Sequence, residues 1–240
     1  MKIIQIGMNI KLMKTNDYEI LKEFKVFSFL KKEEQEVINK HLFYRTYKKN
    51  QILFTEGDPR ERIYFLIDGF VKLEKTNIEA TTTYTHYIKP KELFPYRGMF
   101  NDEYYNISAS ALTDVTLYYI PTKVFEVLVK NNKEQLSYII NQLSDIIGHH
   151  ENRIQIFSLN HVREKVELSI AHLMKYYGEE NGCEVKVDLP MTIKELSMML
   201  GISRESVSAC VGDLQKERLV SVINKNINIH DPHYFQNKLA

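Results

Sequence analysis

The sequence predicts an α+β protein built of three successive parts: an antiparallel β-roll of the jelly-roll kind, a long helix and a winged helix-turn-helix. Short β-branched and aromatic runs separated by turn residues fill residues 24–121. A proline-free stretch with heptad spacing follows, and two short capped helical patterns with an alternating run come last. We therefore place the parts at residues 1–23 (a leader or short helix), 24–125, 126–158 and 159–240.

Composition places the chain among ordinary globular proteins. Its 240 residues are 44% hydrophobic and 26% charged, and the net charge is +1, so neither disorder nor a bulk attraction to nucleic acid or membrane is indicated. No apolar run approaches the roughly 18 residues of a membrane span, and no secretory cleavage site follows the N-terminal residues. We expect a soluble cytoplasmic protein without a membrane partner.

The β-roll is predicted from six short runs of strand-forming residues. Turn signals such as the Glu-Gly-Asp-Pro at 56–59 and the Asp-Gly at 68–69 separate them. Many short strands with frequent turns are typical of a sandwich or jelly roll rather than a parallel sheet. The runs are 51–54, 63–67, 70–73, 81–88, 107–111 and 115–120.

The long helix is predicted over 132–157, where Gly148 is the only glycine. Apolar residues recur there at alternating steps of four and three, an a/d pattern over about three heptads. One narrow apolar stripe between two domains needs a partner, which favours a homodimer seam; the alternative is a helix lying on its own domain's core. The seam residues are Leu136, Ile140, Leu143, Ile147, His150, Ile154 and Phe157.

The helix-turn-helix is predicted from capping and turn residues near the C-terminus. A helix over about 162–177 comes first. Thr192 and Glu195 then form a capping box, Gly201 supplies a left-handed residue that ends this helix, and Ser203 caps the next one. The alternating run 220–229 reads as a β-hairpin, which makes a wing.

The second helix of this motif carries the residues that suit DNA. Arg204 and Glu205 stand at its exposed start, where a recognition helix meets base edges; Arg suits guanine and Glu suits the cytosine amino group. Residues 160–240 hold ten Lys and Arg against eleven Asp and Glu, so non-specific affinity should be modest. A solvated helical hairpin in a protein-interaction domain is the alternative. The predicted DNA contacts are Thr192, Lys194, Ser203, Arg204, Glu205, Ser206, Ser208 and Lys225.

From about residue 24 to 230 the chain resembles the CRP/FNR family of bacterial transcription regulators. The resemblance lies in Gly-Ile-Ser-Arg-Glu-Ser-Val at 201–207 and in the glycine framework of a cyclic-nucleotide-type roll at 56–73. It implies a homodimer that binds a palindromic operator, with RNA polymerase as a partner where the regulator activates. Arg204 and Glu205 would read a TGTGA-type half-site. Ala209 stands where the best-known member has a second Arg, which leaves one base pair of the half-site open.

The effector of such a regulator is not indicated by the resemblance. Cyclic-AMP-binding members use a Gly-Glu-Leu turn and, about ten residues on, an Arg with a Ser or Thr. Here the turn contains Glu92, and the Arg and Ser places fall on Tyr105 and Asn106. A buried phosphate would then lack its charged partner, so cyclic AMP is not expected. Another small molecule, or control by abundance alone, is left open. The aromatic loop 94–100 resembles members from low-GC Gram-positive bacteria.

Other functions find little support in the sequence. Zinc-protease, P-loop and serine-hydrolase motifs are lacking, so we predict a non-enzyme without metal or cofactor. A signalling or scaffold protein that uses the roll for ligand or protein binding is the alternative function. Cys183, in a predicted loop, and Cys210, on the recognition helix, are the two cysteines; oxidation of Cys210 blocking DNA binding is a further hypothesis.

Overall fold

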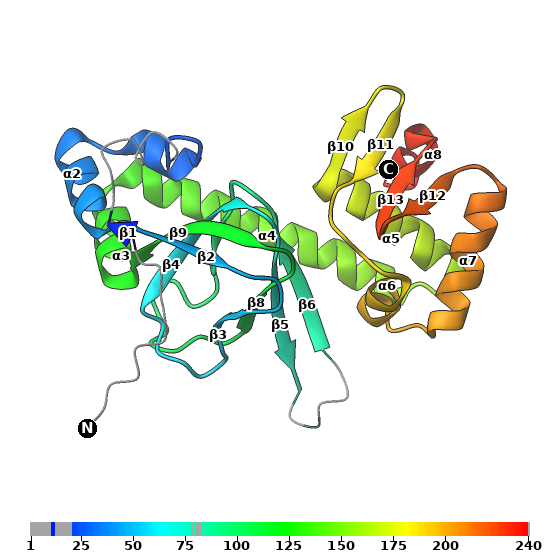
Figure 1. Cartoon of the computed structure of the whole chain (residues 1–240), viewed down its shortest axis with the longest axis horizontal. Coiled ribbons are helices and arrows are strands. Elements are labelled where there is room, and N and C mark those ends of the chain that lie inside the picture. The colour runs from blue at the N-terminus through cyan, green and yellow to red at the C-terminus, as the bar shows by residue number, and fades with distance from the viewer. Residues whose placement is uncertain (1–10, 13–20, 78, 80–82, 240) are drawn as a thin grey trace. The chain divides into compact units, whose positions relative to one another are not determined.

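The chain forms two compact units, Met1–Ser144 and Asp145–Ala240, and the long helix α4 (Lys133–Ser158) contributes residues to both. The computed structural model describes residues 11–12, 21–77, 79 and 83–239. Strands dominate the first unit, and helices surround a small sheet in the second (Figure 1). The predicted α+β class, with a roll, a long helix and a winged helix-turn-helix in this order, is confirmed. Among these residues, no helix combines the length and apolar character of a membrane span.

Two antiparallel sheets make the β-roll. One has the strand order β1-β2-β9-β4-β7 and the other β3-β8-β5-β6. Each of the six predicted runs contains a strand, with residues 81–82 outside the described part, while β1, β2 and β7 are additional. The bounds are β1 Lys11–Leu12, β2 Phe43–Tyr47, β3 Ile52–Phe54, β4 Arg62–Asp68, β5 Val71–Thr76, β6 Thr83–Ile88, β7 Leu93–Phe94, β8 Ser108–Ala111 and β9 Val115–Pro121.

Strand β4 separates two cores, because its side chains alternate between the two faces of the sheet. Ile63 and Phe65 point into the cluster that the helices cover, whereas Tyr64 and Leu66 point into the interior of the roll. All four are at most 1% exposed. A strand that is buried on both faces needs the continuous apolar run that the sequence has here.

Helices η1 (Lys25–Phe29), α2 (Lys32–His41) and α3 (Thr122–Asn131) cover the outer face of the first sheet. The long helix predicted over 132–157 is present as α4, which begins at Lys133, whereas residue 126, where we placed the start of that part, lies inside α3, which ends at Asn131. Asn132 breaks the run, since its backbone is extended and its Oδ1 accepts from the Gln135 N–H at 3.2 Å, capping α4. Its Nδ2 donates to the Phe29 carbonyl at 2.9 Å.

The second unit combines four further helices with one antiparallel sheet of order β10-β11-β13-β12. Helix α5 spans Val162–Tyr177, as predicted. The hairpin of β10 and β11 was not anticipated, because its first strand is polar throughout. The remaining bounds are β10 Gly178–Asn181, β11 Glu184–Val187, α6 Ile193–Leu200, α7 Arg204–Lys216, β12 Val220–Ile223, β13 Asn226–Ile229 and α8 Pro232–Gln236.

The expected leader or short helix over residues 1–23 falls mostly outside the described residues, which exclude 1–10 and 13–20. The described piece at Lys11–Leu12 is a strand, β1, paired with Phe43 and Tyr44 of β2. Leu21 is fully buried in the helix-covered core.

Candidate DNA-binding interface

Two caps and a left-handed glycine set the turn between α6 and α7. Thr192 Oγ1 accepts from the Glu195 N–H at 3.1 Å, and the Glu195 carboxylate accepts from the Thr192 N–H at 2.7 Å. Gly201 ends α6 at φ 63°, a conformation that favours glycine. Ser203 Oγ accepts from the Ser206 N–H at 3.1 Å and starts α7. The predicted capping box, glycine turn and serine cap are confirmed.

The inner face of α7 holds the motif together. Val207, Val211 and Leu214 are at most 2% exposed, and α7 packs on both α5 and α6. Leu196 and Leu200 supply the buried face of α6. The three predicted inward positions of α7 are confirmed, and their burial fixes which side of the helix faces outward.

The outer face of α7 presents Arg204, Glu205 and Ser208 to solvent. Within the described part of the chain, no hydrogen bond or ion pair engages the side chains of Arg204 or Glu205. The Ser203 and Ser206 hydroxyls lie 2.9 Å apart and bond each other. A phosphate at this helix start would therefore meet backbone N–H groups and two hydroxyls that already hydrogen-bond each other.

The β12–β13 hairpin takes the place of the predicted wing. Asn224 and Lys225 form its two-residue turn with φ of 52° and 69°, the twist that tight hairpins favour. The Lys225 carbonyl accepts from the Met191 N–H at 2.8 Å, which ties the wing to the segment before α6. The side chains of Lys225 and Lys194 are exposed, whereas the Thr192 hydroxyl is committed to its cap.

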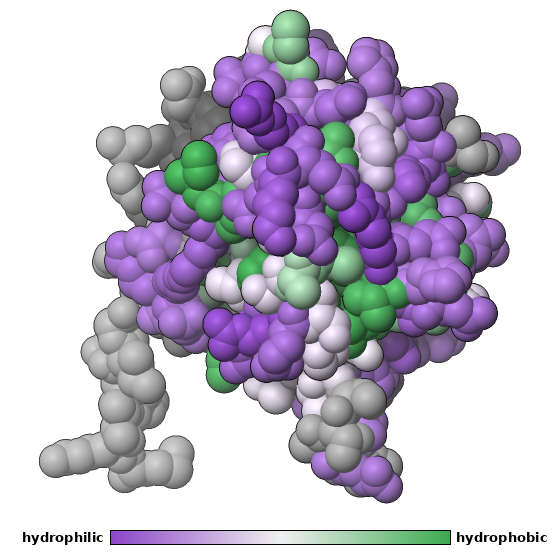
Figure 2. All heavy atoms as spheres, turned by 90° about the vertical axis from the view of Figure 1, so that its right-hand side faces the viewer, coloured by the Kyte–Doolittle hydropathy of each residue, from purple (hydrophilic) through white to green (hydrophobic). Residues whose placement is uncertain are grey.

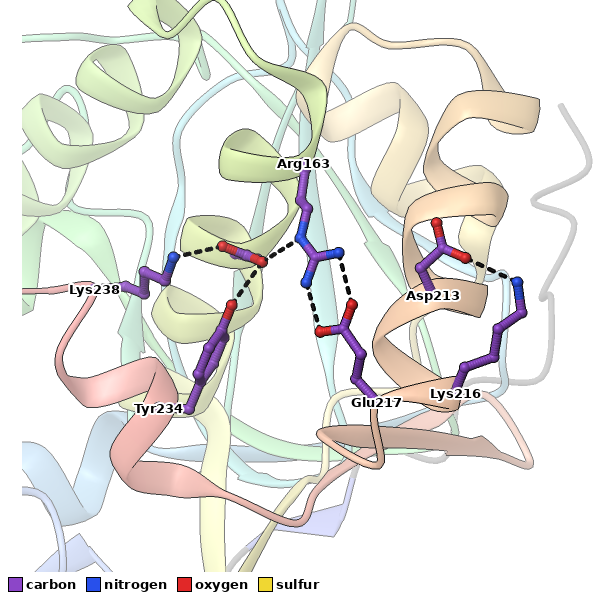
Figure 3. Close-up of polar contacts among 7 residues, drawn as sticks. Arg163, Asp213, Lys216, Glu217, Tyr234 and Lys238 are labelled. Carbon is purple, nitrogen blue, oxygen red and sulfur yellow. Dashed lines mark hydrogen bonds and ion pairs between the residues drawn. The ribbon is translucent and has the colours of Figure 1, made fainter.

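A buried carboxylate on the scaffold helix α5 joins this helix to α8 and to Lys238 (Figure 3). The Glu167 side chain is 4% exposed and accepts from Arg163 Nε at 2.8 Å, from the Tyr234 hydroxyl at 2.8 Å and from Lys238 Nζ at 2.7 Å. Burial alone would raise the pKa of Glu167, but these three donors together lower it below its usual value. The carboxylate therefore stays ionised and fully hydrogen-bonded at neutral pH.

The same arginine reaches the end of α7. Two guanidinium nitrogens of Arg163 contact the Glu217 carboxylate at 2.8 Å and 2.6 Å, a bidentate pair at the C-terminus of α7 (Figure 3). Arg163 thus connects the recognition helix to Glu167 and, through it, to α8 and Lys238. The sequence shows little of this network: the i, i+4 spacing of Arg163 and Glu167 is visible, whereas Glu217 lies 54 residues from Arg163.

The two cysteines lie in different surroundings. Cys210 is partly buried on α7, and burial raises the pKa of its thiol, so the reactive thiolate is disfavoured at neutral pH. Cys183 is exposed in the β10–β11 turn. Oxidation of Cys210 blocking DNA binding stays an untested hypothesis that its surroundings do not favour.

The predicted seam residues divide into two sets along α4. Leu136 and Leu143 pack against the helix-covered core of the first unit, and His150 is half-buried. By contrast, a second set repeats every seven residues and is left open, with exposed fractions of 57%, 58% and 63%. Its members are Ile140, Ile147 and Ile154, and Phe157 beyond them is 44% exposed.

The predicted effector residues Glu92, Tyr105 and Asn106 each have their own partners. Tyr105 is 4% exposed; its ring stacks on Phe54 at 3.8 Å, and its hydroxyl donates to the Arg62 carbonyl at 2.9 Å. Asn106 donates to Asp102. Glu92 makes no hydrogen bond with either of them among the described residues, and burial raises the pKa of its carboxyl to about 7.

The face of the second unit seen in Figure 2 is mainly hydrophilic, with hydrophobic side chains in separate small patches. Such a surface suits a polar partner better than an apolar one. Within the described residues, no group of three or more His, Cys, Asp or Glu is arranged to hold a metal ion.

Two family models match the chain. The model of the cyclic nucleotide-binding domain matches residues 44–132, and that of the Crp-like helix-turn-helix domain matches residues 169–237. The second match covers the capped turn, the recognition helix and the wing. The first covers most of the β-roll.

Relatives and solved structures span most of the chain. The HTH-type transcriptional regulator ArcR of Staphylococcus epidermidis is 30% identical over 184 residues, which cover 77% of this chain and 80% of that protein. A global nitrogen regulator of Nostoc sp. is 25% identical over 191 residues, 78% and 85% of the two chains. A CooA variant from Carboxydothermus hydrogenoformans has a TM-score of 0.70 at 18% identity, covering 96% of this chain and 98% of that one. FixK2 from Bradyrhizobium japonicum has a TM-score of 0.69 at 16% identity, covering 81% and 95%.

Proposed function

The chain belongs to the CRP/FNR family of transcription regulators, and from this premise we propose that it binds a TGTGA-like palindrome as a homodimer, without cyclic AMP. The observation that carries the proposal is the pair Arg204 and Glu205, exposed at the capped start of α7 without a partner among the described residues. Two charged side chains held at the start of a recognition helix are available to guanine and to the cytosine amino group.

Contacts to phosphate would set the register of this helix on the duplex. Lys194 precedes α7 in the sequence and Lys225 follows it on the wing, and both side chains are exposed. Ser203, Ser206 and Ser208 stand at or near its start, and Thr192 precedes α6. Because acidic and basic residues balance in this domain, sequence-independent affinity would be modest, and base contacts would carry more of the binding.

A dimer would double these contacts, and α4 supports it. Ile140, Ile147 and Ile154 form an exposed stripe with a spacing of seven residues, which is the spacing of one position of a coiled-coil seam. Three large exposed aliphatic side chains in one row favour burial against a second copy. Two recognition helices could then meet successive major grooves about 34 Å apart.

Independence from cyclic AMP is supported by the interior of the roll. Tyr105, at the place where the resemblance puts the phosphate-binding arginine, is a core residue whose hydroxyl bonds the backbone of Arg62. It offers no positive charge to a buried phosphate. The staphylococcal relatives favour the low-GC Gram-positive branch. A regulator of this kind would act in the cytoplasm, and would meet RNA polymerase if it activates.

Fluorescence anisotropy tests the proposal directly. The purified protein is titrated into a labelled duplex carrying the palindrome at fixed salt, with a scrambled duplex as control, with and without cyclic AMP. We expect tight binding to the palindrome that cyclic AMP does not change. Binding only with cyclic AMP would overturn the effector part. Equal binding to both duplexes would overturn the half-site and favour a signalling or scaffold role.

A further inference from the structure

Arg163 of α5 binds two carboxylates at once. Its two outer guanidinium nitrogens contact the Glu217 carboxylate at the end of α7, at 2.8 Å and 2.6 Å. The third nitrogen, Nε, donates to Glu167 at 2.8 Å. Each nitrogen of this guanidinium therefore has a carboxylate partner. Because the group is planar and the contact to Glu217 is bidentate, the guanidinium fixes the direction of the Glu217 carboxylate as well as its distance.

The Arg163 end of this pair is itself held in place. Glu167, four residues further along α5, has a side chain that is 4% exposed. It also accepts from the Tyr234 hydroxyl at 2.8 Å and from Lys238 Nζ at 2.7 Å. A buried carboxylate with three donors has little freedom to move, and it restrains the arginine that it binds. Glu217 thus bonds to a fixed framework rather than to a mobile surface side chain (Figure 3).

Glu217 lies on one flank of α7, beside the buried inner face. Its backbone is still helical, with φ −74° and ψ −2°, and its N–H donates to the Asp213 carbonyl at 2.9 Å. At about 3.6 residues per turn, Glu217 stands about a quarter turn to one side of the inner face. Arg204 and Ser208 stand up to about a quarter turn to the other side. The ion pair and these predicted DNA contacts are therefore on opposite flanks of one helix.

A roll of α7 about its own axis would move both flanks together. The apolar contacts of the inner face are non-directional, so by themselves they resist a small roll only weakly. A helix with its side chains is about 10–12 Å wide, so a roll of about 15° displaces its outer atoms by roughly 1.5 Å. Hydrogen bonds to a base edge tolerate less, since their lengths span only about 2.7–3.2 Å. The directed bonds from Arg163 to Glu217 oppose such a roll.

We propose that Glu217, held by Arg163, is a positioning residue that fixes the roll of α7 and thereby the direction in which Arg204 meets DNA. The inference rests on the proposed function, because it takes α7 as the helix that reads the operator. It adds a specificity-determining residue at the end of α7 remote from the predicted base contacts. Both side chains of the pair are 44% exposed, so its removal should change stability little and discrimination more.

Anisotropy titrations with two duplexes test this role. The specific duplex is the one that the wild type selects from a random pool, the other is its scrambled counterpart, and the measured quantity is the ratio of the two affinities. Glu217→Gln should lower this ratio about fivefold, because the amide loses the charged bidentate contact. Glu217→Lys, which repels Arg163, should lower it about tenfold or more. Glu217→Asp, which keeps the carboxylate, should retain most of it.

Asp213 provides the matched control, since it carries the same charge on the same helix. Its carboxylate pairs with Lys216 at 2.9 Å, so this bond stays within α7 (Figure 3). Asp213→Asn and Asp213→Lys repeat the two changes of charge and should leave the ratio within about twofold of the wild type. The thermal unfolding midpoint of Glu217→Gln should change by no more than about 4 °C.

A double-variant cycle shows whether Glu217 acts through Arg204. In the Arg204→Ala background, Glu217→Gln should lower the ratio no further, because the side chain that it positions is gone. A residue that only stabilises the domain would have the same effect in both backgrounds.

Two results would overturn the positioning role alone. One is an equal ratio in Glu217→Gln and Asp213→Asn, and the other is an equal effect of Glu217→Gln with and without the Arg204 side chain. A wild type that prefers no duplex of the pool would overturn the proposed function and this inference with it. The two kinds of failure are therefore distinguishable.

Discussion

At the start of α7, Arg204 and Glu205 stand in solvent without a partner among the described residues, whereas in the roll Tyr105 is stacked and hydrogen-bonded inside the core. The resemblance to the CRP/FNR family places DNA contacts at the first position and an effector contact at the second. The difference is that an exposed side chain without an internal partner (an open position) is available to a partner outside the chain, whereas a buried, hydrogen-bonded side chain (a closed position) already has its partner within the chain. Changes at open positions should alter binding, and changes at closed positions should alter stability.

The largest effect on binding is expected at the open stripe of α4. Ile147→Asp with Ile154→Asp places two charges where a second copy would pack, so we expect monomers and loss of operator binding by more than about a hundredfold. Sedimentation velocity and anisotropy measure both quantities. Asn141→Asp with Gln155→Asp adds the same charges beside the stripe and should leave a dimer. A tight-binding monomer would contradict the seam.

The next effect is expected at the open pair on α7. Arg204→Ala should weaken binding to the palindrome about 10- to 100-fold, while affinity for a scrambled duplex changes little, because a bidentate base contact carries roughly 1–3 kcal/mol of discrimination. The thermal unfolding midpoint should stay at the wild-type value, since the side chain is exposed. Lys194→Ala is the comparison: as a phosphate contact, it should weaken both duplexes alike.

Glu167 is a buried, hydrogen-bonded side chain in the same domain, and its removal should alter stability. Glu167→Ala leaves Arg163, Tyr234 and Lys238 without their shared acceptor, so we expect a loss of about 2–3 kcal/mol in the free energy of unfolding. Chemical denaturation followed by circular dichroism measures it. Glu164→Ala, three residues earlier on the same helix and only partly buried, is the control. An unchanged midpoint for Glu167→Ala would mean that this carboxylate does not stabilise the packing of α5 against α8.

Acid should destabilise the second unit through His149. Burial, and then the charges of Arg153, His150, His172 and Lys175, lower the pKa of His149 to about 4. The unfolded chain, with a pKa of roughly 6.5, takes up the proton first, so this contribution to stability is complete above that pH and is lost as the pH falls toward 4. In the His149→Gln variant, the thermal unfolding midpoint should fall less steeply than in the wild type between roughly pH 6.5 and pH 4. His161→Gln should leave it as in the wild type.

The smallest effect is expected at Tyr105. Tyr105→Phe keeps the ring on Phe54 and removes the hydrogen bonds of the hydroxyl to the Arg62 backbone and to Tyr64, so the free energy of unfolding should fall by about 1 kcal/mol. Operator affinity, with or without cyclic AMP, should not change. A tenfold change in affinity on adding cyclic AMP, lost in this variant, would mean that Tyr105 contacts an effector after all.

Much of the candidate interface could be predicted because its structure is local. The Thr192–Glu195 box, the turn at Gly201 and the cap at Ser203 each need residues at most three apart, so their spacing alone indicates the geometry. The two-residue turn at Asn224 and Lys225 is local in the same sense. The strand β10 could not be predicted, because a polar strand lacks the apolar alternation that marks most others.

The sequence by itself determined the order of the parts, the helix ends around the turn and the stripe along α4, because periodicity and caps act over a few residues. Only the tertiary structure decided which side chains are buried and hydrogen-bonded. Asn132 meets Phe29 across 103 residues, Arg60 meets Glu126 across 66, and Arg163 meets Glu217 across 54. Such contacts form only when distant segments pack together in the folded chain, so they cannot be predicted from the spacing of nearby residues.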